Sequence, residues 1–186
     1  MLATLPSLEY LETPNKSERS TQDVRLVVVH DPEGSYEDAI ERVKDRLAQV
    51  SYHVLTNDEC TRAVQFVPWP QRAWSCVDFN SCSDNISIAG KAGNAWSYAA
   101  LNRLARIIAF RLRERGLPPK FCSAPVSPDD PPLGFTFHSE LGVAGGAHRD
   151  PGLTGVKKAF LLTSVKYQYM RNKFGSEGRI APELGW

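Results

Sequence analysis

The chain has 186 residues, of which 42% are hydrophobic and 23% charged, the composition of a globular domain rather than of a disordered segment. Its 22 basic and 21 acidic side chains leave a formal net charge of +1, so no strong basic field favours nucleic acid as a partner. No stretch approaches the roughly 20 apolar residues of a membrane-spanning helix, and we expect one domain, a monomer, without a membrane partner.

The N-terminal segment, residues 1–22, is polar with scattered apolar positions, so we expect a flexible arm there and order from residue 23 onward. The segment lacks a basic region followed by an apolar core, and is therefore not a secretory signal. The expected location is a cytoplasm.

The first ordered element is a buried strand over residues 24–29, predicted by a β-branched run that ends at His30. Turn residues follow, and Ser35 is expected to cap a helix, with Asp38 three residues later as a weak capping box. The apolar face of this helix is predicted to contain Ile40, Val43 and Leu47.

Three short strands are expected next, at residues 52–55, 63–67 and 86–90. Between the last two lies a segment, residues 69–84, that is rich in aromatic side chains, Ser, Asn and Asp. We expect it to form a long functional loop.

The clearest helix is predicted over residues 96–115, because its apolar residues fall on one face and Gly116 stands where a C-terminal cap belongs. A strand at 134–138 and a helix over about 154–171 complete the pattern, followed by a tail at 173–186. Strands that alternate with helices indicate a single α/β domain.

The four cysteines, Cys60, Cys76, Cys82 and Cys122, form no CxxC pair, which disfavours a zinc site built on them. A disulfide between Cys76 and Cys82 is conceivable, but reduced thiols are expected in a chain without an export signal.

Two of the four histidines end predicted strands, His30 the first and His138 the last, and Asp150 follows twelve residues after His138. Side chains at strand ends in an α/β sheet face the crevice where ligands bind. Two imidazoles and one carboxylate leave a fourth tetrahedral position open for water, as catalytic zinc requires. Single strand-end histidines are often structural, so spacing alone leaves both interpretations open.

Five segments of the chain form a recognisable series: VVVH at 27–30, SYH at 51–53, VPWPQRAW at 67–74, FHSE at 137–140 and HRDPG at 148–152. In order and spacing they resemble the zinc-dependent N-acetylmuramoyl-L-alanine amidases of the phage lysozyme and peptidoglycan-recognition type. The finer resemblance is to amidase domains in endolysins of phages that infect actinobacteria.

The resemblance implies a central mixed β-sheet flanked by α-helices, with the catalytic domain at residues 23–172. It makes His30, His138 and Asp150 the ligands of one Zn²⁺ ion. The implied reaction is hydrolysis of the amide bond between N-acetylmuramic acid and L-alanine of bacterial peptidoglycan. Such an endolysin would stay in the host bacterial cytoplasm until its release to the cell wall.

Two further residues acquire catalytic roles from the resemblance. The Tyr52 phenol matches a tyrosine beside the metal that would donate to the oxyanion, and His148 matches a position that stabilises the tetrahedral intermediate. Each also has a structural interpretation, as a buried strand tyrosine and a loop histidine. On a strand, His53 would point away from the site if Tyr52 faces it.

Substrate contacts are predicted in the aromatic loop. Trp69, Trp74 and Phe79 offer flat faces for sugar or peptide, although Trp74 could equally pack against the helix at 96–115. Arg72 could meet a peptide carboxylate with its forked donors. The acidic residues Asp31 and Glu33 are either hydrogen-bond acceptors for ligand imidazoles or solvated turn residues.

Two positions depart from the family pattern. Ser75 stands where many members have His, and Ser87 appears in the strand where many have a proton-transferring Glu. The alternative function is therefore a peptidoglycan-recognition module with weak or no amidase activity. An unrelated zinc peptidase is disfavoured, because nothing resembles HExxH.

Overall fold

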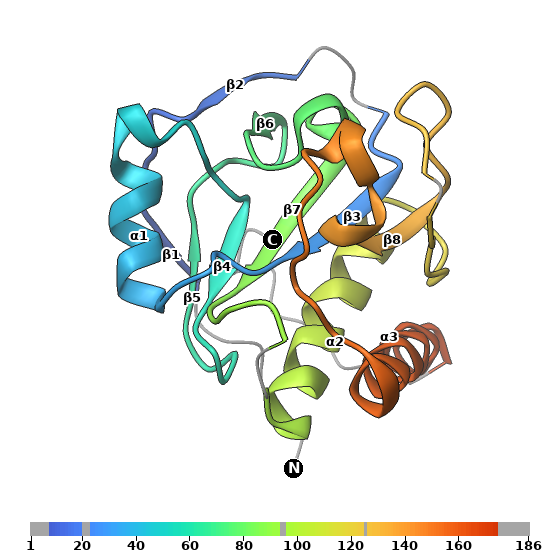
Figure 1. Ribbon diagram of the computed structural model, residues 1–186. Helices are drawn as coiled ribbons and strands as arrows, with labels where there is room; N and C mark the ends of the chain where they lie inside the picture. Colours follow the sequence, from blue (N-terminus) through green and yellow to red (C-terminus); the bar gives the residue numbers. More distant parts are fainter. Residues whose placement is uncertain (1–7, 20–22, 94–95, 125, 175–186) are drawn as a thin grey trace.

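The computed structural model describes residues 8–19, 23–93, 96–124 and 126–174. A six-stranded mixed sheet forms its centre, with the strand order β1-β5-β4-β7-β3-β8, and β2 and β6 form a separate antiparallel pair (Figure 1). The strands are β1 (Leu8–Tyr10), β2 (Lys16–Glu18), β3 (Leu26–His30), β4 (Val54–Thr56), β5 (Ala63–Gln65), β6 (Gln71–Ala73), β7 (Ser83–Ile88) and β8 (Gly134–Phe137).

Helices cover both faces of this sheet. Helices α2 (Tyr98–Glu114) and α3 (Gly155–Phe174) pack on one face against β3, β7 and β8, and α1 (Tyr36–Lys44) packs on the other face near β4 and β5. The predicted single α/β domain with a central mixed sheet flanked by helices is confirmed. Within the described residues, none of the helices has the length and apolar character needed to cross a membrane.

The strand β3 lies between β7 and the edge strand β8, and its five residues are all buried. It pairs in parallel with β7 on one side and β8 on the other, which explains why its sequence is a continuous β-branched run rather than an alternating one. Parallel pairing places the carboxyl ends of β3 and β8 side by side, at the edge where the site is built.

The predicted caps of two helices are also present. The Ser35 hydroxyl accepts a hydrogen bond from the Asp38 backbone N–H at 3.1 Å, and Gly116 follows α2 with a φ of +66°, a conformation that favours glycine at a helix end. Leu47 differs from its expected place on the apolar face of α1. The helix ends at Lys44, and the Leu47 side chain is 89% exposed on a following 3₁₀ turn.

Residues 8–19 differ from the expected flexible arm. The strand β1 pairs in parallel with β5, and β2 pairs antiparallel with β6. Arg19 is buried and contacts Asp84 at 3.0 Å. These strands have three residues each, too few for a periodic pattern, and their partners lie far along the chain. Residues 1–7, 20–22 and 175–186, which include most of the expected tail, lie outside the described residues.

The expected loop at 69–84 is more ordered than its composition indicates. It contains β6, a 3₁₀ turn at Val77–Phe79 and the first two residues of β7. Asp84 therefore lies on a central strand, fully buried. All four cysteines are buried free thiols.

A buried ionic cluster connects Asp84 to three arginines. Its carboxylate contacts Arg19 at 3.0 Å, Arg111 of α2 at 2.7 Å and Arg115 at 2.8 Å. Burial would raise the pKa of Asp84, but the surrounding His53 and arginines outweigh burial and lower it. The cluster fixes the N-terminal segment and α2 to the middle of the sheet.

His53 makes part of the stability depend on pH. Burial lowers the pKa of His53 to about 4, whereas an unfolded histidine titrates near 6.5. The unfolded chain therefore binds this proton first on acidification, so the contribution is complete above pH 6.5 and is lost as the pH falls toward 4. We expect the free energy of unfolding, measured with urea, to decline over that window less steeply in His53→Gln than in the wild type. Equal slopes would contradict this assignment.

Candidate metal centre

Three potential metal ligands converge at the carboxyl ends of β3 and β8. His30 is the last residue of β3, His138 follows β8 directly, and Asp150 comes from the loop before α3. The two Nδ1 atoms are 3.1 Å apart. The Asp150 carboxylate lies 3.5 Å from Nδ1 of His30 and 3.0 Å from Nδ1 of His138. The candidate donor atoms of all three residues lie within 4.8 Å of one another, the spacing of a single-ion site.

The charge of this cluster favours a bound cation. All three residues are buried. Burial would raise the pKa of Asp150, but the adjacent imidazoles of His138 and His30 outweigh burial and hold the pKa well below its usual range. Burial and the neighbouring His138 lower the pKa of His30. A buried carboxylate beside a neutral imidazole is the protonation state that metal binding requires.

The outer nitrogens of both imidazoles are engaged elsewhere. Nε2 of His30 lies 2.9 Å from the Asn85 side-chain oxygen, and Nε2 of His138 lies 2.7 Å from the Gly145 carbonyl oxygen. A ring that donates from Nε2 keeps its Nδ1 lone pair. The two Nδ1 lone pairs face each other and the Asp150 carboxylate. These groups repel one another unless a cation lies between them. The residues therefore fit a zinc ion, with two imidazoles, one carboxylate and an open fourth position.

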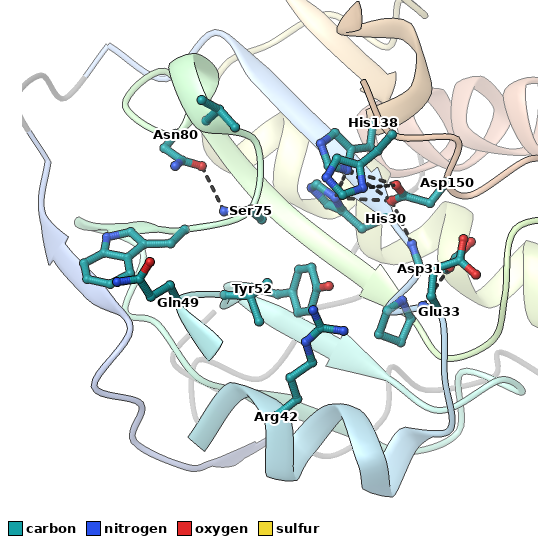
Figure 2. Close-up of a pocket in the computed structure, with 15 residues that line it drawn as sticks. His30, Asp31, Glu33, Arg42, Gln49, Tyr52, Ser75, Asn80, His138 and Asp150 are labelled. Carbon is teal, nitrogen blue, oxygen red and sulfur yellow. Dashed lines mark hydrogen bonds and ion pairs between the residues drawn. The ribbon is translucent and has the colours of Figure 1, made fainter. Parts of the chain in front are cut away.

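A pocket opens from this cluster, and Figure 2 shows the three ligand side chains together at one end of it. Tyr52 lies in the middle, with its ring 5.4 Å from that of His30. Burial, and to a lesser extent the Asp150 carboxylate, raises the pKa of Tyr52, so the phenol remains a donor at neutral pH. The lining residues are His30, Asp31, Pro32, Glu33, Arg42, Gln49, Val50, Tyr52, Trp74, Ser75, Val77, Asn80, His138, His148 and Asp150.

His148 lies where the sequence analysis expects it, at the ligand end of the pocket. Its ring stacks on that of His138 with 4.3 Å between centroids, and its Nδ1 is 3.8 Å from the Asp150 carboxylate. The side chain is 57% exposed, so it can reach a molecule that enters the pocket. His53 points away from the pocket and stacks on Trp69, as the strand alternation predicts.

Asp31 and Glu33 line the pocket without accepting from either ligand imidazole, since Asn85 and Gly145 take that role. The Asp31 backbone N–H instead donates to the Asp150 carboxylate at 3.2 Å. The Asp31 carboxylate accepts from the Glu33 N–H at 3.0 Å. Burial, opposed by that hydrogen bond, raises the pKa of Asp31 to about 7.

Of the four predicted substrate contacts, the structure places Trp74 in the pocket. Trp69, Arg72 and Phe79 do not line it, which corrects the prediction for these three. Trp69 is held between His53 and the Arg111 guanidinium. Phe79 is fully buried under β3. Arg72 donates to the Ser17 and Ser81 hydroxyls.

Several lining residues were not singled out by the sequence analysis. Figure 2 shows Arg42 reaching from α1 toward Tyr52, with Gln49 and Asn80 farther from the ligands. Arg42 lies one position from Val43, which packs in the core. Residues three apart on a helix share a face, and Arg42 is three positions after the buried Ala39, so this spacing could have indicated its direction.

The two serine departures have different surroundings. Ser75 lines the pocket, and Ser87 is fully buried within β7, outside the pocket lining. Serine at either place cannot transfer a proton at neutral pH.

Comparison with known proteins decides the family. The sequence profile of the N-acetylmuramoyl-L-alanine amidases matches residues 20–153, which include all three candidate ligands. The chain belongs to this family.

A curated relative agrees with the assignment of the chain to the amidase family. N-acetylmuramoyl-L-alanine amidase A of Achromobacter lyticus is 32% identical over 105 residues, covering 55% of this chain and 59% of that protein. The chain thus spans about three fifths of the curated relative's length.

Solved structures share the fold. The hydrolase AmiA of Staphylococcus aureus, solved with its ligand, superposes with a TM-score of 0.71 at 18% identity, over 91% of this chain and 86% of that one. The endolysin of the Thermus scotoductus bacteriophage Ph2119 gives a TM-score of 0.58 at 17% identity, over 84% and 99%.

Proposed function

We propose that the protein is a zinc-dependent amidase that hydrolyses the bond between the lactyl group of N-acetylmuramic acid and L-alanine in peptidoglycan. The observation that carries the proposal is the converging donor set of His30, His138 and Asp150, with both imidazole Nε2 atoms already occupied. Membership of the amidase family supports the choice of substrate bond.

The chemistry that a zinc ion would supply here is a bound water with a pKa of about 7 and a polarised amide carbonyl. His30, His138 and Asp150 would hold the ion. The Tyr52 phenol, kept protonated by burial, can donate to the oxygen of the amide that gains negative charge. His148 can pass a proton toward the leaving alanine nitrogen, because it stacks beside a ligand and remains open to the pocket.

The biological setting that we propose is a phage endolysin, with the finer placement in a phage of actinobacteria. Endolysins among the structural neighbours support the first part, and the sequence resemblance supports the second. Such a protein acts on peptidoglycan as a monomer, without a nucleic-acid or membrane partner, after its release from the host cytoplasm.

A peptidoglycan-recognition module is the second candidate, favoured by Ser75 in the pocket and Ser87 in β7 in place of proton-transferring side chains. The two candidates differ in turnover. We therefore expect purified protein, incubated with actinobacterial cell walls, to release new N-terminal alanine without new reducing sugar ends. A chelator should stop this release and added zinc restore it. Binding to the walls with no new N-terminal alanine would establish the recognition module instead.

Tyr52→Phe should lower kcat by about 10²–10³, the cost of losing one donor to a developing oxyanion. The substitution keeps the buried ring and removes the hydroxyl, so zinc content and the melting temperature should stay close to those of the wild type. Steady-state kinetics on a soluble muramyl peptide measure the effect. An unchanged kcat would make Tyr52 a packing residue.

Arg42→Gln should raise KM for substrates with an acidic stem peptide by up to about fivefold, the scale of an exposed ion pair. Within the described residues, the Arg42 guanidinium makes no hydrogen bond or ion pair, and Arg42 lines the pocket, so a peptide carboxylate can bind this guanidinium. Arg46→Gln is the matched control, since Arg46 lies just beyond α1 and does not line the pocket. Equal KM values for the acidic and the amidated stem peptide in the wild type would refute this role.

A further inference from the structure

We propose that Asn85 is a positioning residue that holds His30 in the tautomer able to bind zinc. Its side-chain oxygen accepts the Nε2 proton of His30, which leaves the Nδ1 lone pair directed at the metal position. The inference rests on the proposed function for the identity of the metal, and its test uses metal binding and ring protonation rather than catalysis.

The orientation of the Asn85 amide follows from the hydrogen bonds of the neighbouring Ser83 hydroxyl. The Ser83 hydroxyl lies 2.8 Å from the Phe79 carbonyl oxygen. A carbonyl only accepts, so the single hydroxyl proton of Ser83 is used there. The Ser83 oxygen is then an acceptor for the Asn85 amide nitrogen at 3.2 Å. The nitrogen is therefore the amide atom of Asn85 closer to the Ser83 hydroxyl, at 3.2 Å against 3.5 Å for the oxygen, and the oxygen makes its shortest contact with His30.

The Cys76 thiol is compatible with the same orientation. Its sulfur lies 3.3 Å from the Asn85 side-chain oxygen and 3.3 Å from the Ser83 hydroxyl oxygen, and a thiol is a weak donor to either. A flipped amide would direct its nitrogen at His30 and bring its oxygen toward the Ser83 backbone carbonyl, which the amide nitrogen now contacts at 3.5 Å. Two oxygens facing each other in a fully buried position repel, so the flipped form is disfavoured.

The tautomer of His30 follows from the 2.9 Å contact between the Asn85 oxygen and Nε2 of His30. An amide oxygen cannot donate, so Nε2 must carry the proton. Neutral imidazole has one N–H, which leaves Nδ1 of His30 as an acceptor. That atom is the one that faces Nδ1 of His138 at 3.1 Å and the Asp150 carboxylate at 3.5 Å.

The two histidines thus reach the same tautomer by different means. His138 donates to a backbone carbonyl, that of Gly145, which no substitution removes. His30 depends on a side chain. The backbone N–H of Asn85 donates to Nδ1 of His53 at 3.0 Å, and β7 pairs with the strand that ends in His30. The buried interior therefore fixes the acceptor in place.

Two substitutions separate the hydrogen bond from packing. Asn85→Leu keeps a similar shape and removes the acceptor, whereas Asn85→Asp keeps an oxygen toward His30. The matched control is Ser87→Ala, two residues along β7, whose hydroxyl makes no hydrogen bond to a ligand residue within the described part of the chain. We expect Asn85→Leu to weaken zinc binding by about 10–100-fold, the usual cost of losing an outer partner of a ligand histidine. Asn85→Asp and Ser87→Ala should bind zinc nearly as the wild type does.

The measurement is zinc affinity by competition with a chromogenic chelator, alongside nitrogen–proton correlation spectra of the histidine rings in zinc-free protein. In the wild type we expect His30 protonated at Nε2, and in Asn85→Leu a mixture of tautomers. Wild-type-like zinc affinity in a folded Asn85→Leu, or a wild-type His30 protonated at Nδ1, would overturn the proposal. If Asn85→Leu fails to fold, the wild-type tautomer still decides it. A protein that binds zinc as expected but cleaves no muramyl peptide would refute the proposed function and leave this inference standing.

Discussion

His138→Ala is expected to remove zinc binding and amide hydrolysis together. His138 supplies one of three donors, and its Nδ1 is the atom nearest the Asp150 carboxylate, at 3.0 Å. Two remaining donors leave the ion in a buried position with too few ligands. The loss of affinity should exceed the roughly 10–100-fold cost of removing an outer partner.

The control for this experiment is His148→Ala, which removes the ring that stacks on His138 but supplies no ligand atom to the cluster. This variant should keep its zinc, with a lower rate of hydrolysis. Zinc added to the zinc-free protein should raise the melting temperature of the wild type and of His148→Ala, because a ligand that binds the folded state stabilises it. It should leave the melting temperature of His138→Ala unchanged. Stoichiometric zinc in His138→Ala, measured by elemental analysis, would show that the ion binds elsewhere.

Asp84→Asn is expected to destabilise the fold by about 3–5 kcal/mol, the usual effect of removing one partner from a buried ion pair. The substitution preserves the side-chain shape and removes the charge. It leaves the guanidinium groups of Arg19, Arg111 and Arg115 next to one another without a counter-charge. Urea unfolding at pH 7 measures the loss.

The matched control is Asp130→Asn, because this carboxylate also pairs with an arginine, Arg25 at 3.4 Å, but is 90% exposed. Exposed pairs contribute about 0–1 kcal/mol, so this variant should unfold almost as the wild type does. Since the pKa of Asp84 is lowered in the folded state, its contribution is present above about pH 4, where unfolded aspartate titrates, and is lost as the pH falls further. An Asp84→Asn protein as stable as Asp130→Asn would mean that the arginines hold their places without the carboxylate.

The sequence alone was sufficient to predict the sheet class and to bring the three ligands together. The run before His30 has an unmistakable β-branched pattern, and strand ends in an α/β sheet point to one edge. His138 follows from the same rule, and Asp150, which lies in the loop before α3, follows from the family resemblance. These features are local in sequence or repeat across the family, which makes them visible without coordinates.

The remaining features depend on contacts between distant parts of the chain. Arg19 looks like part of a polar arm, because its partner Asp84 lies 65 residues away. Asn85 falls between the expected loop at 69–84 and the expected strand at 86–90, and its role depends on which way a buried amide faces. Neither property leaves a periodic signal in the sequence.

The predicted aromatic contacts show the limit of composition as a guide. Trp69 and Phe79 stand in a polar segment, which suggested exposed rings, but β6 and the turn at Val77–Phe79 fold them inward. Trp74 lies on the same segment and reaches the pocket. Side-chain direction in a short irregular segment is set by tertiary packing, and local sequence does not determine it.

The bond that is broken is the central claim, and hydrolysis of a defined muramyl peptide in water enriched in heavy oxygen tests it most directly. Attack on the lactyl carbonyl places the heavy oxygen in the lactyl carboxylate of the muramic acid product and leaves a peptide with an unlabelled free N-terminal alanine. We predict this pattern in mass spectra of the products, with the reaction dependent on zinc and absent in His138→Ala. Heavy oxygen in a peptide carboxylate or at a reducing sugar end would contradict the amidase assignment. So would a zinc-loaded protein that leaves the substrate intact.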